Sequence, residues 1–98
     1  MGSEKQFYVY IVECADGTLY TGWTNDVEKR INEHNGGRSG AKYTRSRRPV
    51  RLLFVKECLS LSDALKEEAR IKRMSKAQKI QMIDAQEGSL RPQATGLR

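Results

Sequence analysis

The first quarter of the chain contains two short strand-like segments around a tight-turn dipeptide, and this pattern constrains the fold more than any other. Residues 7–14 are almost all aromatic or β-branched, and they are followed by Asp16-Gly17, a dipeptide that supplies the positive φ angles of a hairpin turn. A second segment of the same kind covers residues 18–23. The sequence therefore predicts an antiparallel hairpin.

Side chains alternate along a strand, so the first segment has two different faces. One face carries only apolar side chains, and we expect it to pack against helices. The other face carries the phenol groups of Tyr8 and Tyr10. The second segment adds Tyr20, and four tyrosines in the first half of the chain indicate that the hydroxyl groups matter. The alternative is that they are interface aromatics with solvated hydroxyls.

A helix is predicted over residues 26–35. Asn25 and Glu28 have the spacing of a capping box, and Gly36-Gly37 would end the helix. The residues at positions i, i+3, i+4 and i+7 form one stripe that should face the sheet. They are Val27, Arg30, Ile31 and His34.

Arg30 and His34 lie four residues apart on this stripe, and two interpretations are open. They could be an amphipathic pair at the edge of the core. Alternatively, the guanidinium could bind a phosphate in a bidentate manner while the imidazole hydrogen-bonds or transfers a proton.

Residues 36–49 form a basic segment with no acidic residue. The whole chain has 18 Lys and Arg against 12 Asp and Glu, a net charge of +6, and this segment supplies most of the excess. Such charges are often only solvated, but cations interleaved with Gly, Ser and Thr favour contact with a phosphate backbone, and Tyr43 could stack on a base. The cations are Arg38, Lys42, Arg45, Arg47 and Arg48.

A third strand is predicted over residues 51–58, and two more helices follow. Ser60 or Ser62 caps a helix that runs to about Met74. Ser75 and Gln78 form a capping box for the last helix, over residues 76–85. Its inward residues should be Ala77, Ile80 and Ile83.

The predicted inward stripe of the second helix contains a carboxylate, Glu68, whereas Glu67 should point elsewhere. A buried carboxylate is costly unless a cation, a hydrogen bond or a metal satisfies it. The alternatives are an ion pair with Lys72 or Arg30, which is the commoner arrangement, and a metal site. The stripe reads Leu61, Ala64, Leu65, Glu68, Ile71 and Lys72.

The order of elements is β-β-α-β-α-α, which predicts an α+β fold with helices packed on a three-stranded, mainly antiparallel sheet. We expect one domain over residues 7–86, an N-terminal tail over 1–6 and a disordered tail over 87–98. Cys14 and Cys58 should be reduced, and no zinc site is expected around a single histidine. No membrane-spanning segment is visible, and a cytoplasmic location is expected.

The ordered set of motifs resembles the GIY-YIG nuclease family, and within it the small, uncharacterised bacterial proteins that stand alone. The two name motifs correspond to residues 8–10 and 20–22, and the family's arginine, histidine and glutamate match Arg30, His34 and Glu68. Segments 40–45 and 68–72 match the signature of that small branch. The similarity covers residues 7–83.

This resemblance implies hydrolysis of DNA phosphodiesters with one divalent cation, Mg²⁺ or Mn²⁺. Glu68 would bind the metal, and Tyr20 would take a proton from the attacking water while Tyr10 positions the network. Arg30 would neutralise charge on the phosphate, and His34 would hydrogen-bond or transfer a proton. The partner would be DNA, branched or damaged DNA included, and a partner protein could supply specificity.

Three departures from the family pattern bear on activity. Tyr8 replaces the first glycine of the name motif, and Trp23 stands where excision-repair members have a lysine. Lys42 or Lys72 could supply the missing contact. The chain also has no asparagine beyond Glu68. The runner-up function is therefore a nucleic-acid-binding module with little or no cleavage. A protein-interaction domain ranks third, because that role makes least use of the basic segment.

Overall fold

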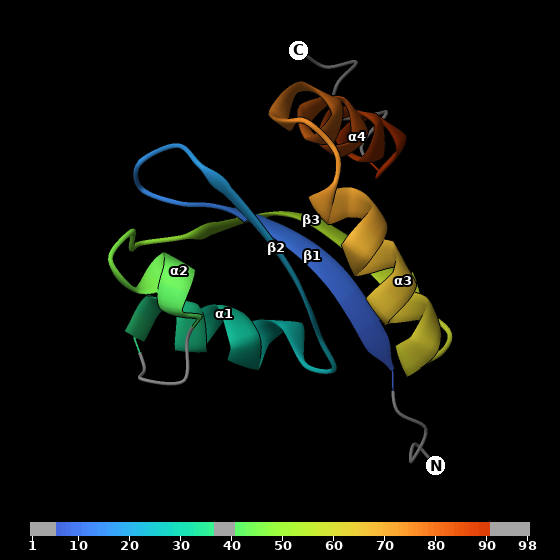
Figure 1. Cartoon of the computed structure of the whole chain (residues 1–98), viewed down its shortest axis with the longest axis horizontal. Helices are drawn as coiled ribbons and strands as arrows, with labels where there is room; N and C mark the ends of the chain where they lie inside the picture. The colour runs from blue at the N-terminus through green and yellow to red at the C-terminus, as the bar shows by residue number, and fades with distance from the viewer. Residues whose placement is uncertain (1–5, 37–40, 91–98) are drawn as a thin grey trace.

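The computed structural model describes residues 6–36 and 41–90, with the side chains described as far as residue 86 (Figure 1). The elements, in chain order, are β1 (Phe7–Glu13), β2 (Leu19–Thr24), α1 (Val27–Gly36), α2 (Lys42–Arg45), β3 (Arg51–Cys58), α3 (Leu61–Lys72) and α4 (Lys76–Leu90).

The sheet has three antiparallel strands in the order β2-β1-β3, which confirms the predicted α+β class. The β1–β2 hairpin turns at Gly17, whose φ of +86° is the left-handed conformation that the Asp-Gly dipeptide predicted. The Asp16 carboxylate stabilises this turn by accepting hydrogen bonds from Thr18 N at 3.1 Å and Thr18 Oγ1 at 2.6 Å.

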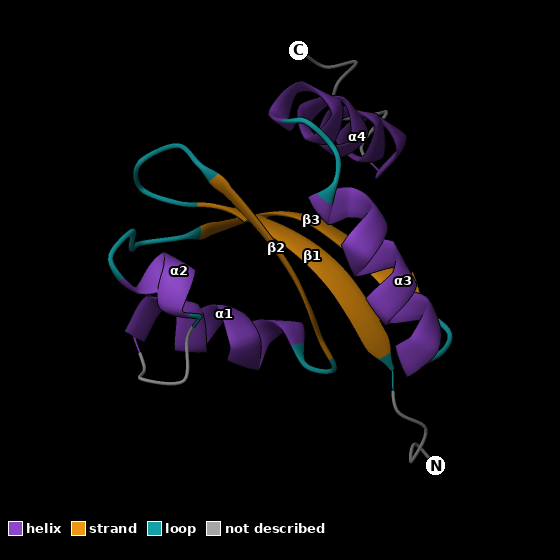
Figure 2. Cartoon of the chain, in the orientation of Figure 1, coloured by secondary structure: helices purple, strands orange, loops and turns teal. Residues whose placement is uncertain are grey.

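Helices cover both faces of the sheet (Figures 1 and 2). On one face Val9 and Ile11 form a core with residues of β3, α3 and α4. On the other, Tyr10 and Val12 form a second core, against which Ile31 of α1 packs. The sequence predicted a packed apolar face and an opposite face of phenols, but α1 covers that second face too, and Tyr10 is only 1% exposed.

The N-termini of α1, α3 and α4 are capped by side chains, with one correction to the predicted caps. Asp26, not Asn25, caps α1, because its Oδ1 accepts from Lys29 N at 3.1 Å while its own N–H donates to Thr24 Oγ1 at 3.1 Å. Ser60 caps α3 through Asp63 N at 3.1 Å. Ser75 and Gln78 form the predicted capping box of α4, with reciprocal bonds of 2.8 and 3.1 Å.

The predicted loop between α1 and β3 contains the single helical turn α2. Its backbone closes on the Ala41 carbonyl, which accepts from Thr44 N at 3.1 Å and from Arg45 N at 3.2 Å. A turn this short has no apolar periodicity, so the sequence pattern could not predict it.

Two further predictions about the helices were wrong in part. Leu61 and Leu65 of α3 are exposed, because the buried stripe is centred on Ala64 and Ile71, both 0% exposed. In α4, Ile83 is buried, but Ala77 and Ile80 are exposed.

The helix α4 continues past the predicted end at residue 85 and is anchored to the sheet edge by a side-chain amide. Gln86 Nε2 donates to the Val55 carbonyl at 2.6 Å, and Val55 N donates to Gln86 Oε1 at 3.4 Å. The part of the predicted C-terminal tail beyond residue 90, and the N-terminal residues 1–5, lie outside the described residues.

Cys14 and Cys58 are free thiols, as predicted, and both are buried. In the described part of the chain, no helix combines the length and the apolar character that a membrane crossing needs.

Candidate active site

A buried hydrogen-bond chain connects β1, α1 and α2. The Tyr10 hydroxyl lies 2.7 Å from His34 Nε2, and His34 Nδ1 lies 2.8 Å from Thr44 Oγ1. Tyr10, His34 and Thr44 are all at most 1% exposed. The predicted inward stripe of α1 therefore places His34 against the tyrosine face of the hairpin.

Burial determines the protonation of this pair. It raises the pKa of Tyr10 to about 12, so the phenol stays neutral at physiological pH. Burial, reinforced by the nearby Arg30 cation, lowers the pKa of His34 to about 4, so the imidazole is neutral too. His34 is fully buried and both of its ring nitrogens are hydrogen-bonded, so it can act on a substrate only through Tyr10.

Tyr10 lies directly over Gly22 of the neighbouring strand. The two residues are paired across β1 and β2. A Cβ atom at position 22 would lie 2.6 Å from the Tyr10 hydroxyl oxygen, which is closer than atoms can approach. The glycine that ends the second tyrosine motif is thus required by the position of the Tyr10 hydroxyl.

Tyr20 lies at the half-buried rim of the same cluster. Its ring meets the His34 ring edge-on, with centroids 5.4 Å apart, and stacks on Tyr43 with centroids 5.8 Å apart. The Arg47 guanidinium lies 4.0 Å from the centroid of the Tyr43 ring. Tyr43 therefore supports Tyr20. These contacts occupy part of the Tyr43 ring surface that we expected to stack on a base.

Arg30 borders the cluster from α1. Its guanidinium forms an ion pair with Glu33, where Nη1 and Oε1 are 3.0 Å apart, and its charge acts on the Tyr10 hydroxyl. The Arg30 side chain keeps 25% of its surface exposed. The charge is thus oriented by Glu33 and is partly exposed to solvent.

Glu68 is half-buried on α3, and the ion pair that we considered for it is present, with Lys72 Nζ 3.5 Å from its carboxylate. The Glu68 carboxylate is close enough to Tyr10 to affect the electrostatic environment of its hydroxyl, as do Arg30 and Tyr20. The neighbouring Glu67 has a separate role. It pairs with Arg70 and with Lys56, which lower its pKa to about 2.

The single carboxylate of Glu68 fits a magnesium or manganese ion whose other positions water and the substrate would fill. Mg²⁺ is commonly held by one or two carboxylates, with waters and phosphate oxygens in the other positions. Glu68 is a partly exposed carboxylate whose ion pair is loose at 3.5 Å. Within the described ranges no group of three His, Cys, Asp or Glu side chains could hold a metal, so binding would depend on phosphate oxygens.

The described cations of the basic segment differ in how far they are exposed. Arg47 Nε contacts Asp16 at 3.0 Å, and Arg48 Nε donates to the His34 carbonyl at 2.6 Å, so both hold the segment onto the fold. Lys42 and Arg45 are exposed on α2. The predicted contact residue Arg38 lies outside the described residues.

Sequence reasoning missed two residues of the site region, Thr44 and Lys79. Thr44 carried no signal beyond its place in the 40–45 signature. Lys79, on α4, lies near Lys72, and burial together with that cation lowers its pKa. The sequence gives no signal that Lys79 lies near Lys72, because the turn between α3 and α4 determines how close the two residues are.

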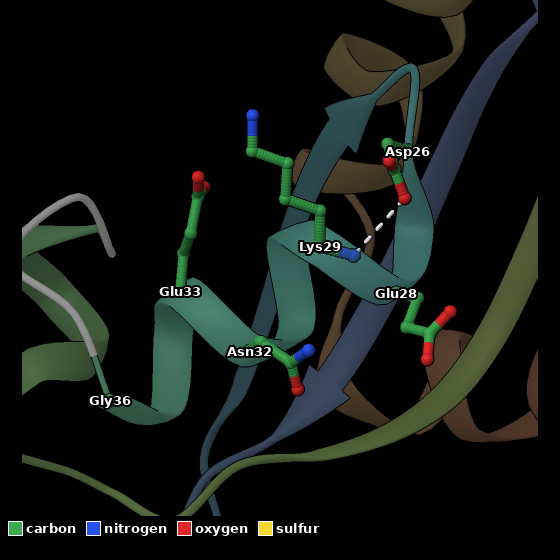
Figure 3. A pocket seen from close by; sticks show the side chains of 6 residues that line it. All are labelled: Asp26, Glu28, Lys29, Asn32, Glu33 and Gly36. Carbon is green, nitrogen blue, oxygen red and sulfur yellow. Dashed lines mark hydrogen bonds between the residues drawn. The ribbon is translucent and has the colours of Figure 1, made fainter.

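A hollow on the outer face of α1 is a separate feature and does not suit a phosphate backbone. It is lined by Asp26, Glu28, Lys29, Asn32, Glu33 and Gly36 (Figure 3). Three of these side chains are carboxylates, which would repel DNA.

Comparisons with known proteins show the family of this chain. The family model described as the GIY-YIG catalytic domain matches residues 6–81. A UPF0213 protein of Syntrophus aciditrophicus is 62% identical over 76 residues, which make up 78% of this chain and 87% of that protein. The UPF0213 protein OB0043 of Oceanobacillus iheyensis is 46% identical over 84 residues, which make up 86% of this chain and 96% of that protein.

Two solved structures share the fold. The solution NMR structure of EF2693 from E. faecalis has 39% identity and a TM-score of 0.60, with coverage of 89% of this chain and 92% of that one. For the UPF0213 protein BH0048 from Bacillus halodurans the identity is 42% and the TM-score 0.54, with coverage of 82% and 84%. With its tyrosine motifs, its fold and its relatives in agreement, this chain belongs to the GIY-YIG family, among the small proteins named UPF0213.

Proposed function

We propose that this protein is a metal-dependent DNA endonuclease. The family suggests a nuclease. The observation that supports the proposal most is the cluster of Tyr10, Tyr20, Arg30 and His34, formed by three elements around one buried hydroxyl, with the charge of Glu68 in range. A purely structural ion pair at Glu68 would not need the rest of this cluster.

In this mechanism each residue has a role that its surroundings allow. Tyr20, at the rim, would act as a phenolate, a form that nearby cations favour, and would become a phenol by taking a proton from the attacking water. Stacking on Tyr43 restricts its ring. Arg30 donates to the phosphate and stabilises the charge that develops there. Glu33 holds the guanidinium in place, and His34 holds the Tyr10 hydroxyl.

Glu68 would hold one Mg²⁺ or Mn²⁺ ion, which when bound polarises the phosphate and lowers the pKa of a coordinated water. Lys72, the present partner of Glu68, would then turn its ammonium group towards phosphate oxygens. We expect affinity for the free ion to be weak, because the described protein donors are few.

DNA would lie across α2 and the tyrosine rim. Lys42 and Arg45 supply exposed positive charge there, and Lys72 supplies it beside Glu68. We extend the proposal to a cytoplasmic location and to branched or damaged DNA, whose shape could be selected by this small surface or by a partner protein.

Incubation of the protein with single-stranded, duplex and branched DNA tests the proposal, in Mg²⁺, in Mn²⁺ and with a chelator. We expect cleavage of at least one substrate that requires a divalent cation. Cleavage that continues undiminished in chelator would contradict the metal mechanism.

One observation favours the second candidate, a nucleic-acid-binding module without cleavage. Trp23 stands where excision-repair members have a lysine, and its ring packs on Phe7 with centroids 6.2 Å apart. It therefore offers no cation to the phosphate. Salt-sensitive DNA binding without cleavage in any condition of the same experiment would support this module.

A further inference from the structure

The hydroxyl of Thr44 ends the hydrogen-bond chain that begins at Tyr10, and its hydrogen has one destination. Thr44 Oγ1 donates to the carbonyl oxygen of Ala41 at 3.0 Å. A hydroxyl carries a single hydrogen, and a carbonyl can only accept. Towards His34 Nδ1, 2.8 Å away, the same oxygen is therefore an acceptor.

The tautomer of His34 follows from this direction. If Thr44 accepts from Nδ1, that nitrogen carries the hydrogen. Because the buried ring is neutral, Nε2 then carries none and presents a lone pair. Tyr10, 2.7 Å from Nε2, must donate its hydroxyl hydrogen to the histidine.

The contact with Arg30 agrees with this assignment. The charge of Arg30 acts on the Tyr10 hydroxyl, and a guanidinium has donors only, so towards Arg30 the phenol oxygen can only accept. With its hydrogen directed to His34, the phenol oxygen presents only lone pairs to Arg30. The other tautomer would place Nε2–H and the guanidinium against the same oxygen and leave the phenol hydrogen to find another acceptor.

We propose that Thr44 is a positioning residue, which fixes His34 as the Nδ1–H tautomer and thereby directs the Tyr10 hydrogen away from Arg30. The Tyr10 oxygen is then a constant acceptor on the side of the guanidinium. The effect on cleavage rests on the function proposed above, whereas the tautomer does not. The short helix α2, on which Lys42 and Arg45 are exposed, thus also determines which nitrogen of His34 carries the hydrogen and where the Tyr10 hydroxyl donates.

The tautomer can be measured directly, because His34 is the only histidine of the chain. Protein labelled with ¹⁵N-histidine should give, at pH 7, the ¹⁵N–¹H correlation pattern of an imidazole protonated on Nδ1. In Thr44→Val, which keeps the shape and loses the acceptor, we expect the Nε2–H form to appear. Thr44→Ser should restore the original pattern.

A wild-type spectrum of the Nε2–H form, or the same tautomer in Thr44→Val as in the wild type, would overturn the assignment. The wild-type spectrum and the Ser variant decide the question even if the Val variant does not fold.

Cleavage kinetics test the consequence for catalysis. Thr44→Val should lose roughly 10- to 100-fold in kcat, as is usual when a supporting hydrogen bond behind an active group is removed, with little change in KM for DNA. Thr44→Ser should recover most of the rate. A tautomer change in Thr44→Val with an unchanged kcat would overturn the positioning role. Absence of cleavage by the wild type would instead refute the proposed function, while the spectra still decide the tautomer.

Discussion

At the scale of single residues, the site depends on a few close approaches that allow no extra atom. The Tyr10 hydroxyl occupies the space that a side chain at Gly22 would need, and it hydrogen-bonds His34 from that position. The glycine and the histidine thus act on the same phenol from different elements.

Gly22→Ala should displace the Tyr10 ring and destabilise the fold. The new Cβ would meet the hydroxyl oxygen at 2.6 Å, and overpacking of this kind costs about 1–3 kcal/mol. Urea denaturation measures the loss. Gly36→Ala is the matched control, since a Cβ there has no atom within 4 Å. Equal stability of the two variants would contradict the close packing over position 22.

The buried neutral His34 should make stability fall as the pH is lowered. Its pKa drops from 6.5 in the unfolded chain to about 4 in the fold, so the unfolded state binds the proton first. The contribution is complete above pH 6.5 and is lost between pH 6.5 and 4, by about 3 kcal/mol for a shift of this size. The cations Arg30 and Arg48 and the acid Glu33 surround the group.

Unfolding free energies at several pH values, for the wild type and His34→Gln, check this expectation. The difference between the two proteins removes the contribution of the acidic residues. It should shrink as the pH falls from 6.5 to 4, and a difference independent of pH would refute the buried neutral histidine.

At the scale of the elements, side-chain amides attach helices to β3 and to Val50, the residue just before it. Asn35 at the end of α1 pairs with the backbone of Val50, with bonds of 2.6 and 3.1 Å. Gln86 of α4 does the same to Val55. The second contact covers part of an edge strand, where unpaired backbone groups would otherwise face solvent.

Gln86→Ala should loosen α4 at this edge. Two backbone hydrogen bonds to Val55 would be lost, at a cost of about 1 kcal/mol. Hydrogen exchange of the Val55 amide should become faster, whereas Gln81→Ala, an exposed change on the same helix, should leave it unaltered. Unchanged protection of Val55 in Gln86→Ala would show that the amide contact does not hold the helix.

The elements also show how far a sequence can predict such a fold. Asp16-Gly17, Ser60 and the Ser75–Gln78 box gave the hairpin and two helix starts, because each depends on residues close in sequence. For Tyr10 and His34, periodicity predicted only that the helix stripe with His34 faces the sheet, and the hydrogen bond between them came from the structure. Residues 42–45 could not be predicted as a helix, and the Thr44 bond to His34 joins segments whose approach the tertiary fold determines.

At the scale of the whole molecule, the described cations are not equivalent although the sequence groups them. Arg47 and Arg48 are tied to Asp16 and to the end of α1, so their loss would weaken the fold as well as the surface. Lys42 and Arg45 on α2 are exposed. The net charge of +6 therefore overstates the positive charge that DNA can contact.

The salt dependence of DNA binding should separate these groups. Lys42→Gln combined with Arg45→Gln should weaken binding and reduce the slope of log Kd against log salt by about 2, one for each phosphate contact removed. Lys29→Gln, on the exposed outer side of α1, should leave the slope unchanged. Fluorescence anisotropy at several salt concentrations measures it, and an equal slope in all three proteins would contradict the DNA path across α2.

The central claim is that Glu68, unlike its neighbour Glu67, supports metal-dependent cleavage. Both carboxylates are half-buried on α3, with 17% and 15% of their side chains exposed, and both form ion pairs with nearby cations. Only Glu68 is proposed to hold the metal, so the two make a matched pair.

The most direct test is single-turnover cleavage of DNA in Mn²⁺ by the wild type, Glu68→Gln and Glu67→Gln. We expect Glu68→Gln to lose at least about 100-fold in rate, because a metal-holding charge is removed, and Glu67→Gln to retain most of the activity. Equal rates for Glu68→Gln and the wild type would contradict the account.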